Sequence, residues 1–291
     1  MPFADNDAAG LQRIAAFVER LQALGWSEGR NIRLDVRWGA GDEQLSRRYA
    51  GELLALAPDL IVVQSTQVLL ALRAVDRTVP VVVANASDLV ELGVADSLAR
   101  PGGNVTGFTF AEHALGGKWV ETLKTIAPHV TRVGTLHSIE GASYFPAVKA
   151  AGPGFGVEVI ALPVRDAAGI TDVITAFARE PNGALIVHPG PLTGIHRRLI
   201  IALAAKHGLP AIYPYRGFID QGGLVCYGID LLELWRSSAG YVDLILRGAR
   251  PADLPVQSAT KIELIINLRT AKALGLAVPP RLLARADEVI Q

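Results

Sequence analysis

Cysteine and net charge are both scarce in this sequence. Its 291 residues include a single cysteine, Cys226, which cannot form a disulfide within its own chain. The sequence therefore excludes a disulfide scaffold, and it fits either the cytosol or a compartment where thiols would oxidise. Basic and acidic residues balance at 28 each. Because a general nucleic-acid or membrane-surface binder needs a basic face, we expect neither function and no nucleic acid as a partner.

Long hydrophobic runs and catalytic motifs are also absent. No apolar run reaches the roughly 18–20 residues of a membrane-spanning helix, and residues 1–5 show no export signal, as in a cytosolic protein or a trimmed chain. The sequence has neither a G-x-S-x-G turn nor an H-E-x-x-H helix. Gly116-Gly117-Lys118 precedes Trp119 where a phosphate loop has Ser or Thr, which indicates a turn that opens a helix. We therefore predict no catalytic residue, metal or cofactor.

Half of the residues are hydrophobic, and the sequence contains an internal repeat of apolar segments. Residues 59–88 and residues 184–217 follow the same order: a short apolar strand, a polar turn, an amphipathic helix, a proline, a second apolar strand and a second polar turn. Apolar runs such as residues 60–63 do not alternate with polar residues, as expected of parallel strands covered by helices on both faces. The alternative is that all βα units look alike.

The repeat extends upstream, where the two copies differ. The first copy begins almost at a helix over residues 11–24, which leads into a strand at residues 32–36. The second copy has a strand at residues 133–136 before its helix at residues 144–151, and a strand follows at residues 157–162. We therefore expect Met1-Pro2-Phe3 to be the remnant of a truncated first strand, with more residues and an export signal upstream in the native precursor.

Alternating strands and helices with short links predict an α/β fold of two doubly wound parallel-sheet lobes. The chain is expected to pass between the lobes more than once, which makes a hinge. The expected lobes are residues 1–110 plus 229–256, and residues 111–228 plus 257–291. After the second copy, the sequence predicts a strand at 222–228, a helix at 231–246, a turn at 251–255, and closing helices at 268–274 and 281–290.

Polar residues gather at the expected carboxyl ends of strands, where open α/β sheets bind ligands near helix N-termini. Ser65 and Thr66 suit a carboxylate, and Asp88 suits an ammonium group. Arg216 offers a bidentate clamp for an acidic group, and tyrosines offer flat walls. The alternative is ordinary helix capping and structural histidines. The candidate ligand-binding residues are Asn6, Ser65, Thr66, Asn85, Ser87, Asp88, His137, Ser138, Tyr144, His188, Tyr213, Arg216 and Tyr227.

Four segments carry a family resemblance: residues 24–31, 100–107, 222–224 and above all 251–290. Across the whole chain, the sequence resembles the ABC-transporter substrate-binding proteins, a family that includes tryptophan/tyrosine-type members. The resemblance implies a type I periplasmic binding fold with three crossovers and a membrane permease partner. It also implies a protein that is periplasmic or lipid-anchored on the outer face of the inner membrane. We further expect a monomer. The sequence departs from the family in lacking the export signal and first strand.

The resulting hypothesis is the solute-binding component of an ABC importer, which closes its hinge on a small molecule, with an aromatic amino acid or a related compound as the leading ligand. An alternative is a two-domain α/β enzyme that acts on a small carboxylate-containing substrate. It would need a paired acid and base, and the sequence identifies none. A third hypothesis is a sensor domain, against which the lack of an attached DNA-binding helix pair or membrane segment counts.

Overall fold

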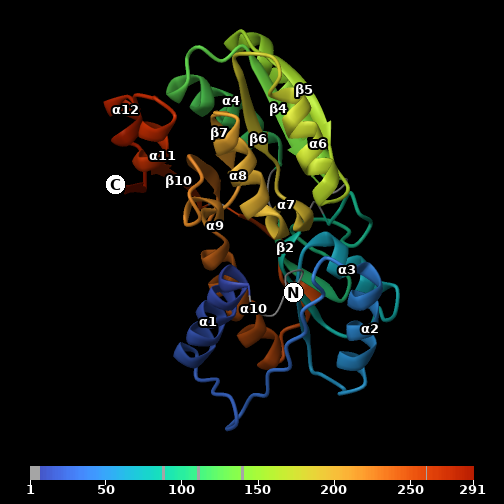
Figure 1. Cartoon of the computed structure of the whole chain (residues 1–291). Coiled ribbons are helices and arrows are strands. Elements are labelled where there is room, and N and C mark those ends of the chain that lie inside the picture. The colour runs from blue at the N-terminus through green and yellow to red at the C-terminus, as the bar shows by residue number, and fades with distance from the viewer. Residues whose placement is uncertain (1–6, 87–88, 110–111, 139–140, 260) are drawn as a thin grey trace. The chain divides into compact units, whose positions relative to one another are not determined.

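The computed structural model describes residues 7–86, 89–109, 112–138, 141–259 and 261–291. The chain forms two compact units. Figure 1 shows the chain coloured by residue number, from blue at the N-terminus to red at the C-terminus. Unit 1 comprises Met1–Ala111 and Leu231–Thr260, and unit 2 comprises Glu112–Asp230 and Lys261–Gln291. The chain therefore crosses from one unit to the other three times. The lobe boundaries expected from the sequence lie within a few residues of these.

Unit 1 is built on a sheet with the strand order β1-β2-β3-β9, in which every neighbouring pair is parallel. Helix α1 packs beside α10, and α2 packs beside α3 (Figure 1). The elements of unit 1 are α1 (Ala8–Ala23), α2 (Glu43–Leu54), β1 (Ile61–Gln64), α3 (Thr66–Arg73), β2 (Val81–Ala86), β3 (Val105–Thr109), α10 (Leu231–Leu246), η3 (Pro251–Asp253) and β9 (Gln257–Ser258).

Local sequence explains these elements. Asp7 and Asp42 cap the first turns of α1 and α2, since each side chain accepts a backbone N–H three residues later. Every residue of β2 is buried, in keeping with a non-alternating valine run covered on both faces. Phe17 and Trp235 join α1 to α10 through an edge-to-face contact with ring centroids 5.6 Å apart.

Gly107 permits the close approach of β3 to β2. Its φ is +132°, and a Cβ atom at this position would stand 2.2 Å from the carbonyl oxygen of Val83. Only glycine fits such a backbone against its neighbour. The glycine at the end of the family-like run 100–107 is therefore required by the sheet itself.

Unit 2 has a larger sheet, with the strand order β11-β10-β8-β7-β6-β4-β5. Helices α4 and α5 pack together, and α6 packs with α8. A buried apolar cluster that includes Leu136, Ile174 and Leu185 joins α6 and α8 to this sheet. The elements are α4 (Glu112–Ile126), β4 (Arg132–His137), η1 (Ala142–Tyr144), α5 (Phe145–Ala151), η2 (Gly152–Phe155), β5 (Glu158–Pro163), α6 (Ala167–Phe177), β6 (Gly183–Val187), α7 (Pro191–Ile195), α8 (Arg197–Lys206), β7 (Ala211–Tyr213), α9 (Arg216–Ile219), β8 (Val225–Ile229), β10 (Ile262–Asn267), α11 (Leu268–Ala273), α12 (Pro280–Leu283) and β11 (Glu288–Ile290).

One strand pair in unit 2 is antiparallel, namely β8 with β10. The chain leaves unit 2 after Asp230 and returns at Lys261. These two residues lie side by side, because the Asp230 N–H donates to the Lys261 carbonyl and their side chains form an ion pair at 2.7 Å. A strand that enters the sheet where β8 leaves it must run in the opposite direction.

The structure differs from the sequence-based expectations in three elements. Residues 32–36 form no strand, since the ladder hydrogen bonds of a neighbour are lacking among the described residues. The expected closing helix at 281–290 is wrong: only α12 is helical, and β11 pairs in parallel with β10. Strand β10, with its buried Leu264-Ile265-Ile266 run, was not expected. No helix among the described residues has the length and apolar character of a membrane span.

Candidate functional site

The carboxyl ends of β1 and β2 bring two buried amides together in unit 1. Gln64 and Asn85 are opposite each other in the β1–β2 ladder, and they are 3% and 7% exposed. The Oε1 atom of Gln64 and the Oδ1 atom of Asn85 have no hydrogen-bond partner among the described residues. Buried polar atoms are almost always satisfied, so two orphans side by side indicate a missing polar partner such as water or a ligand. We call Gln64 and Asn85 the amide pair.

The turn after Gln64 has an unusual backbone. Ser65 adopts φ +90° and ψ 150°, a region that residues other than glycine rarely occupy. The register between β1 and β2 also shifts just before it, between Val63 and Gln64. The Ser65 hydroxyl accepts from the Val68 N–H at 3.4 Å, which makes Ser65 the N-cap of α3. Thr66 is the first residue of that helix. The amide pair thus lies next to a helix N-terminus, whose partial positive charge favours anions.

In unit 2, two histidines meet at neighbouring strand ends. His137 ends β4, and His188 directly follows β6. The His188 N–H donates to the Leu136 carbonyl at 2.9 Å. Their imidazole rings stack with centroids 5.4 Å apart and an interplanar angle of 23°. The sequence-based prediction named both residues, and the structure brings them into direct contact.

Hydrogen bonds fix which nitrogen of each ring carries a proton. The Nδ1 atom of His137 is 2.9 Å from the Thr135 carbonyl oxygen, and the Nδ1 atom of His188 is 2.7 Å from the Gly141 carbonyl oxygen. A carbonyl oxygen only accepts, so both Nδ1 atoms are donors. Burial lowers the pKa of His188 to about 4, which keeps this ring neutral near pH 7. Its Nε2 atom is therefore a buried acceptor, and it has no partner among the described residues.

Aromatic rings surround His188. Trp119 of α4 stacks on it with centroids 5.7 Å apart, and Tyr144 packs at 5.6 Å. Phe145 stacks on the neighbouring His137 at 5.9 Å. The Trp119 indole is held in place because its Nε1–H donates to the Tyr227 carbonyl at 2.6 Å. We call these five rings, His137, His188, Trp119, Tyr144 and Phe145, the aromatic layer of unit 2.

The other predicted residues fall into three groups. Ser138 is buried directly after His137, and Tyr227 contributes its carbonyl to Trp119. Tyr213 instead belongs to the core, where it stacks on Phe218 at 4.9 Å and burial raises the pKa of its hydroxyl. Arg216 already forms a bidentate ion pair with Glu288, at 2.5 and 3.0 Å. Among the described residues, neither Tyr213 nor Arg216 has a hydrogen bond or ring contact with the aromatic layer. Three predicted residues lie outside the described part of the chain: Asn6, Ser87 and Asp88.

Three members of these clusters, Gln64, Trp119 and Phe145, were not predicted from the sequence. Trp119 has helical spacing with Leu115 and Leu123, which are both buried, so its pattern is that of any core residue. Gln64 carried a signal, because it is a polar residue at the end of a buried apolar strand. The described residues contain no group of three or more His, Cys, Asp or Glu side chains placed to hold a metal ion.

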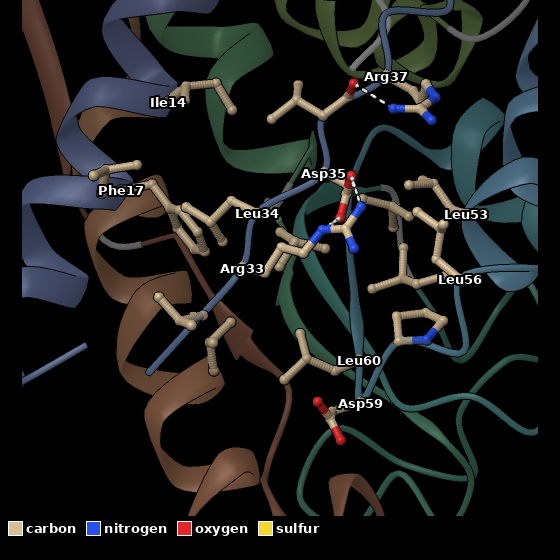
Figure 2. Close-up of a pocket in the computed structure, with 18 of the residues that line it drawn as sticks. Ile14, Phe17, Arg33, Leu34, Asp35, Arg37, Leu53, Leu56, Asp59 and Leu60 are labelled. Carbon is tan, nitrogen blue, oxygen red and sulfur yellow. Dashed lines mark hydrogen bonds and ion pairs between the residues drawn. The ribbon is translucent and has the colours of Figure 1, made fainter. Parts of the chain in front are cut away.

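A separate cavity of about 820 Å³ lies within unit 1, and Figure 2 shows it. None of the predicted site residues lines it. Its walls come from α1, residues 29–37, α2, β1, α3 and α10. It is therefore distinct from the amide pair and from the aromatic layer.

A family model described as ABC transporter substrate binding protein matches residues 5–290, nearly the whole chain. The chain belongs to this family. Members of the family are extracytoplasmic substrate-binding proteins that bind small molecules and work with ABC permeases, and they are not enzymes. The family identified by resemblance from the sequence is thereby confirmed.

The chain is also similar to individual proteins in sequence and in fold. The chain is 24% identical over 269 residues to a tyrosine-binding protein of Clostridioides difficile. The aligned region covers 89% of this chain and 75% of that relative. A Streptococcus pneumoniae ABC domain solved in complex with L-Trp has a TM-score of 0.90 at 23% identity, with 99% of this chain and 97% of that chain covered. A conserved domain protein from Vibrio cholerae reaches the same TM-score at 24% identity and the same coverage. These likenesses confirm the type I periplasmic binding fold.

Proposed function

We propose that this chain is the extracytoplasmic solute-binding component of an ABC importer, and that its ligand is an amino acid with an aromatic side chain carrying a hydrogen-bond donor. The observation that carries the proposal is the orphan Nε2 atom of neutral His188 within the aromatic layer. Flat rings favour stacking with another ring. A neutral Nε2 accepts from an indole N–H or a phenol O–H, and it cannot pair with a donor-free ring.

Unit 1 supplies the groups that suit the amino-acid end of such a ligand. The first turn of α3, capped by Ser65 and begun by Thr66, favours a carboxylate. The orphan oxygens of Gln64 and Asn85 suit an ammonium donor. Asp88, which lies outside the described residues, is assigned to the same ammonium group by the sequence. Closure of both lobes on one ligand stays a prediction.

The names of two relatives support the ligand class. One is called a tyrosine-binding protein, and another was solved in complex with L-Trp. The proposed ligand therefore agrees with the chemistry of both clusters. Import through a permease and a location outside the cytoplasm follow from the family as part of the same proposal.

A thermal-shift panel tests the proposal. A ligand that binds only the folded protein stabilises it by RT ln(1 + [L]/Kd), about 2.7 kcal/mol at 100 times Kd. We expect L-tryptophan or L-tyrosine to raise the melting temperature more than L-phenylalanine, which lacks the ring donor. L-leucine and a hexose serve as controls. A larger shift with the hexose or with L-leucine than with any aromatic amino acid would reject the proposed ligand class.

A further inference from the structure

Gly141 lies against both histidines of the aromatic layer. His137 ends β4 and His188 follows β6, and these two strands are neighbours in the unit 2 sheet (Figure 1). Gly141 is buried, and it is the N-cap residue of η1, the short turn that carries Tyr144. Its peptide group therefore belongs to the surroundings of the rings and not to the surface of the protein.

The carbonyl oxygen of Gly141 holds two members of the aromatic layer. The Nδ1–H of His188 donates to this oxygen at 2.7 Å, and the backbone N–H of Tyr144 donates to it at 3.4 Å. His188 is 0% exposed and Tyr144 is 1% exposed, so bulk water reaches neither side chain. A single main-chain oxygen thereby connects the residue after β6 to the turn that carries Tyr144.

No side chain fits at position 141 unless the main chain shifts. A Cβ atom there would stand 2.9 Å from the Pro189 carbonyl oxygen, 3.2 Å from the His188 Cβ and 3.3 Å from the His137 Cβ. A main-chain carbonyl in a close-packed interior cannot turn aside as the end of a flexible side chain can. The φ of Gly141 is −84°, which other residues also adopt. Glycine is therefore required here by the closeness of the two histidine segments and not by the backbone conformation.

The bond from His188 to Gly141 determines the tautomer of the ring. A neutral imidazole carries one proton, on Nδ1 or on Nε2, and the hydrogen bond made by one nitrogen fixes the state of the other. In water the Nε2–H tautomer of histidine is the more populated. The Gly141 carbonyl reverses this preference, because it accepts only from a protonated Nδ1. The main chain of His188 is also held, since the Thr193 hydroxyl donates to its carbonyl at 2.9 Å.

We propose that Gly141 is the positioning residue that sets the ring selectivity of the binding site, because its carbonyl makes His188 present an acceptor. This proposal rests on the proposed function, in which the ring of an amino acid stacks within the aromatic layer. An indole N–H or a phenol O–H completes Nε2, whereas a ring whose only polar atom is an acceptor leaves two buried lone pairs facing each other and is rejected. Without the Gly141 carbonyl, Nε2 carries the proton and the order of these ligands reverses.

Nitrogen-15 NMR of the ligand-free protein tests the role of Gly141 without any ligand. The chemical shift of a ring nitrogen distinguishes a protonated from an unprotonated atom, and the His188 signals are assigned by their absence from His188→Asn. At pH 7 we expect a protonated Nδ1 and an unprotonated Nε2 in the wild type, and a larger share of the Nε2–H tautomer in Gly141→Ala. A protonated Nε2 in the wild type would overturn the proposal, whether or not Gly141→Ala folds.

Gly154→Ala is the matched control for the substitution. Gly154 is an exposed glycine of the same unit, and nothing lies within 4 Å of the added atom. This variant should keep the wild-type tautomer of His188. An equal change of tautomer in both variants, or no change in a folded Gly141→Ala, would contradict the role of the Gly141 carbonyl.

A ligand panel tests the selectivity itself by calorimetric titration at pH 8. It compares L-tyrosine and L-tryptophan, which carry ring donors, with 3-(4-pyridyl)-L-alanine, whose ring nitrogen is an acceptor. The wild type should prefer a donor ligand, and Gly141→Ala should lower that ratio of affinities by about tenfold or more, as expected for one buried hydrogen bond. A merely structural defect would weaken all three ligands alike. An unchanged ratio in Gly141→Ala would reject the role of Gly141 alone, whereas no binding of any of the three by the wild type would reject the proposed function and the selectivity with it.

Discussion

Gln64 and Asn85 stand opposite each other at the ends of two neighbouring strands, and each buries a side-chain oxygen that has no partner among the described residues. An unsatisfied buried polar atom costs about 1–3 kcal/mol. The buried oxygens of Gln64 and Asn85 therefore do not stabilise the fold, but they are acceptors that a ligand can use. Substitutions at these positions are expected to affect binding more than folding.

Gln64→Met is expected to separate the two effects. The apolar side chain has a similar shape and removes the orphan oxygen, so the free energy of unfolding should stay unchanged or rise by about 1 kcal/mol. Ligand affinity should fall by about tenfold, which corresponds to about 1.4 kcal/mol. Chemical denaturation and calorimetric titration measure these quantities. A variant that loses stability and keeps full affinity would assign Gln64 to the core alone.

His188→Asn is expected to weaken binding with little change in the fold. The Asn amide can still donate to the Gly141 carbonyl, as Nδ1 of His188 does, while the ring and its Nε2 acceptor are lost. Loss of one buried hydrogen bond and a stacked ring should raise Kd by tenfold or more, about 1.5–3 kcal/mol. His129→Asn, at an exposed histidine of the same unit, serves as the matched control. Equal affinities for the two variants would contradict a role for His188 in binding.

The same pair of variants predicts a pH effect on stability. Burial lowers the pKa of His188 to about 4 in the folded state, against about 6.5 when unfolded. The unfolded chain therefore binds the extra proton first, and the stability that His188 confers is complete above pH 6.5 and is lost as the pH falls to 4. Over that interval the wild type should lose about 3 kcal/mol more than His188→Asn. If the difference in unfolding free energy between the wild type and His188→Asn is the same at pH 7 and at pH 4, the result would contradict a buried neutral His188.

Glu263 is predicted to act in the opposite direction. Burial, and then the nearby Asp230, raise the pKa of its carboxyl to about 7 in the folded protein. Since the folded pKa exceeds the unfolded one, stability falls as the pH rises from about 4.5 to 7. Glu263→Gln should therefore gain about 1–2 kcal/mol over the wild type at pH 8, after allowance for solvent screening, and almost nothing at pH 4. Glu158→Gln, on an exposed position of β5, should show no such change.

Gly107→Ala tests the packing of β2 against β3. The added Cβ would meet the main chain of Val83 at a φ that side chains rarely adopt. We expect the variant to lose about 2–4 kcal/mol of unfolding free energy. Gly240→Ala is the control, because nothing lies within 4 Å of the added atom in the middle of α10. It should stabilise the protein by about 0.5–1 kcal/mol. Similar effects from both substitutions would contradict the close strand contact.

Much of the fold was predictable from the sequence because its signals are local. The helical spacing over residues 231–246 predicted α10 with the bounds that the structure shows, and the valine run of β2 predicted a fully buried strand. Residues 32–36 also carry a strand pattern, but a strand forms only when it pairs with a neighbour, and a local pattern does not reveal which segments pair. Strand β11 was mistaken for part of a helix, because its three residues gain their conformation from pairing with β10.

The site was predictable only in part, for a similar reason. Polar residues that follow apolar strands, such as His137 and His188, could be recognised from their position, and the structure places them in contact. Trp119 comes to them from a helix whose pattern is ordinary. Arg216 looked free in the sequence, but Glu288 pairs with it from 72 residues away. Such long-range partners follow from the tertiary fold rather than from local sequence.

Calorimetric titration of the whole chain tests the central proposal most directly. L-tyrosine and L-tryptophan are compared with tyramine, which lacks the carboxylate, and with 3-(4-hydroxyphenyl)propionate, which lacks the amine. We predict one-to-one binding of at least one of the two amino acids, and a loss of at least about tenfold in affinity for each truncated compound. Absence of binding for both amino acids, or equal affinity for the compounds without an amine or a carboxylate, would contradict the account.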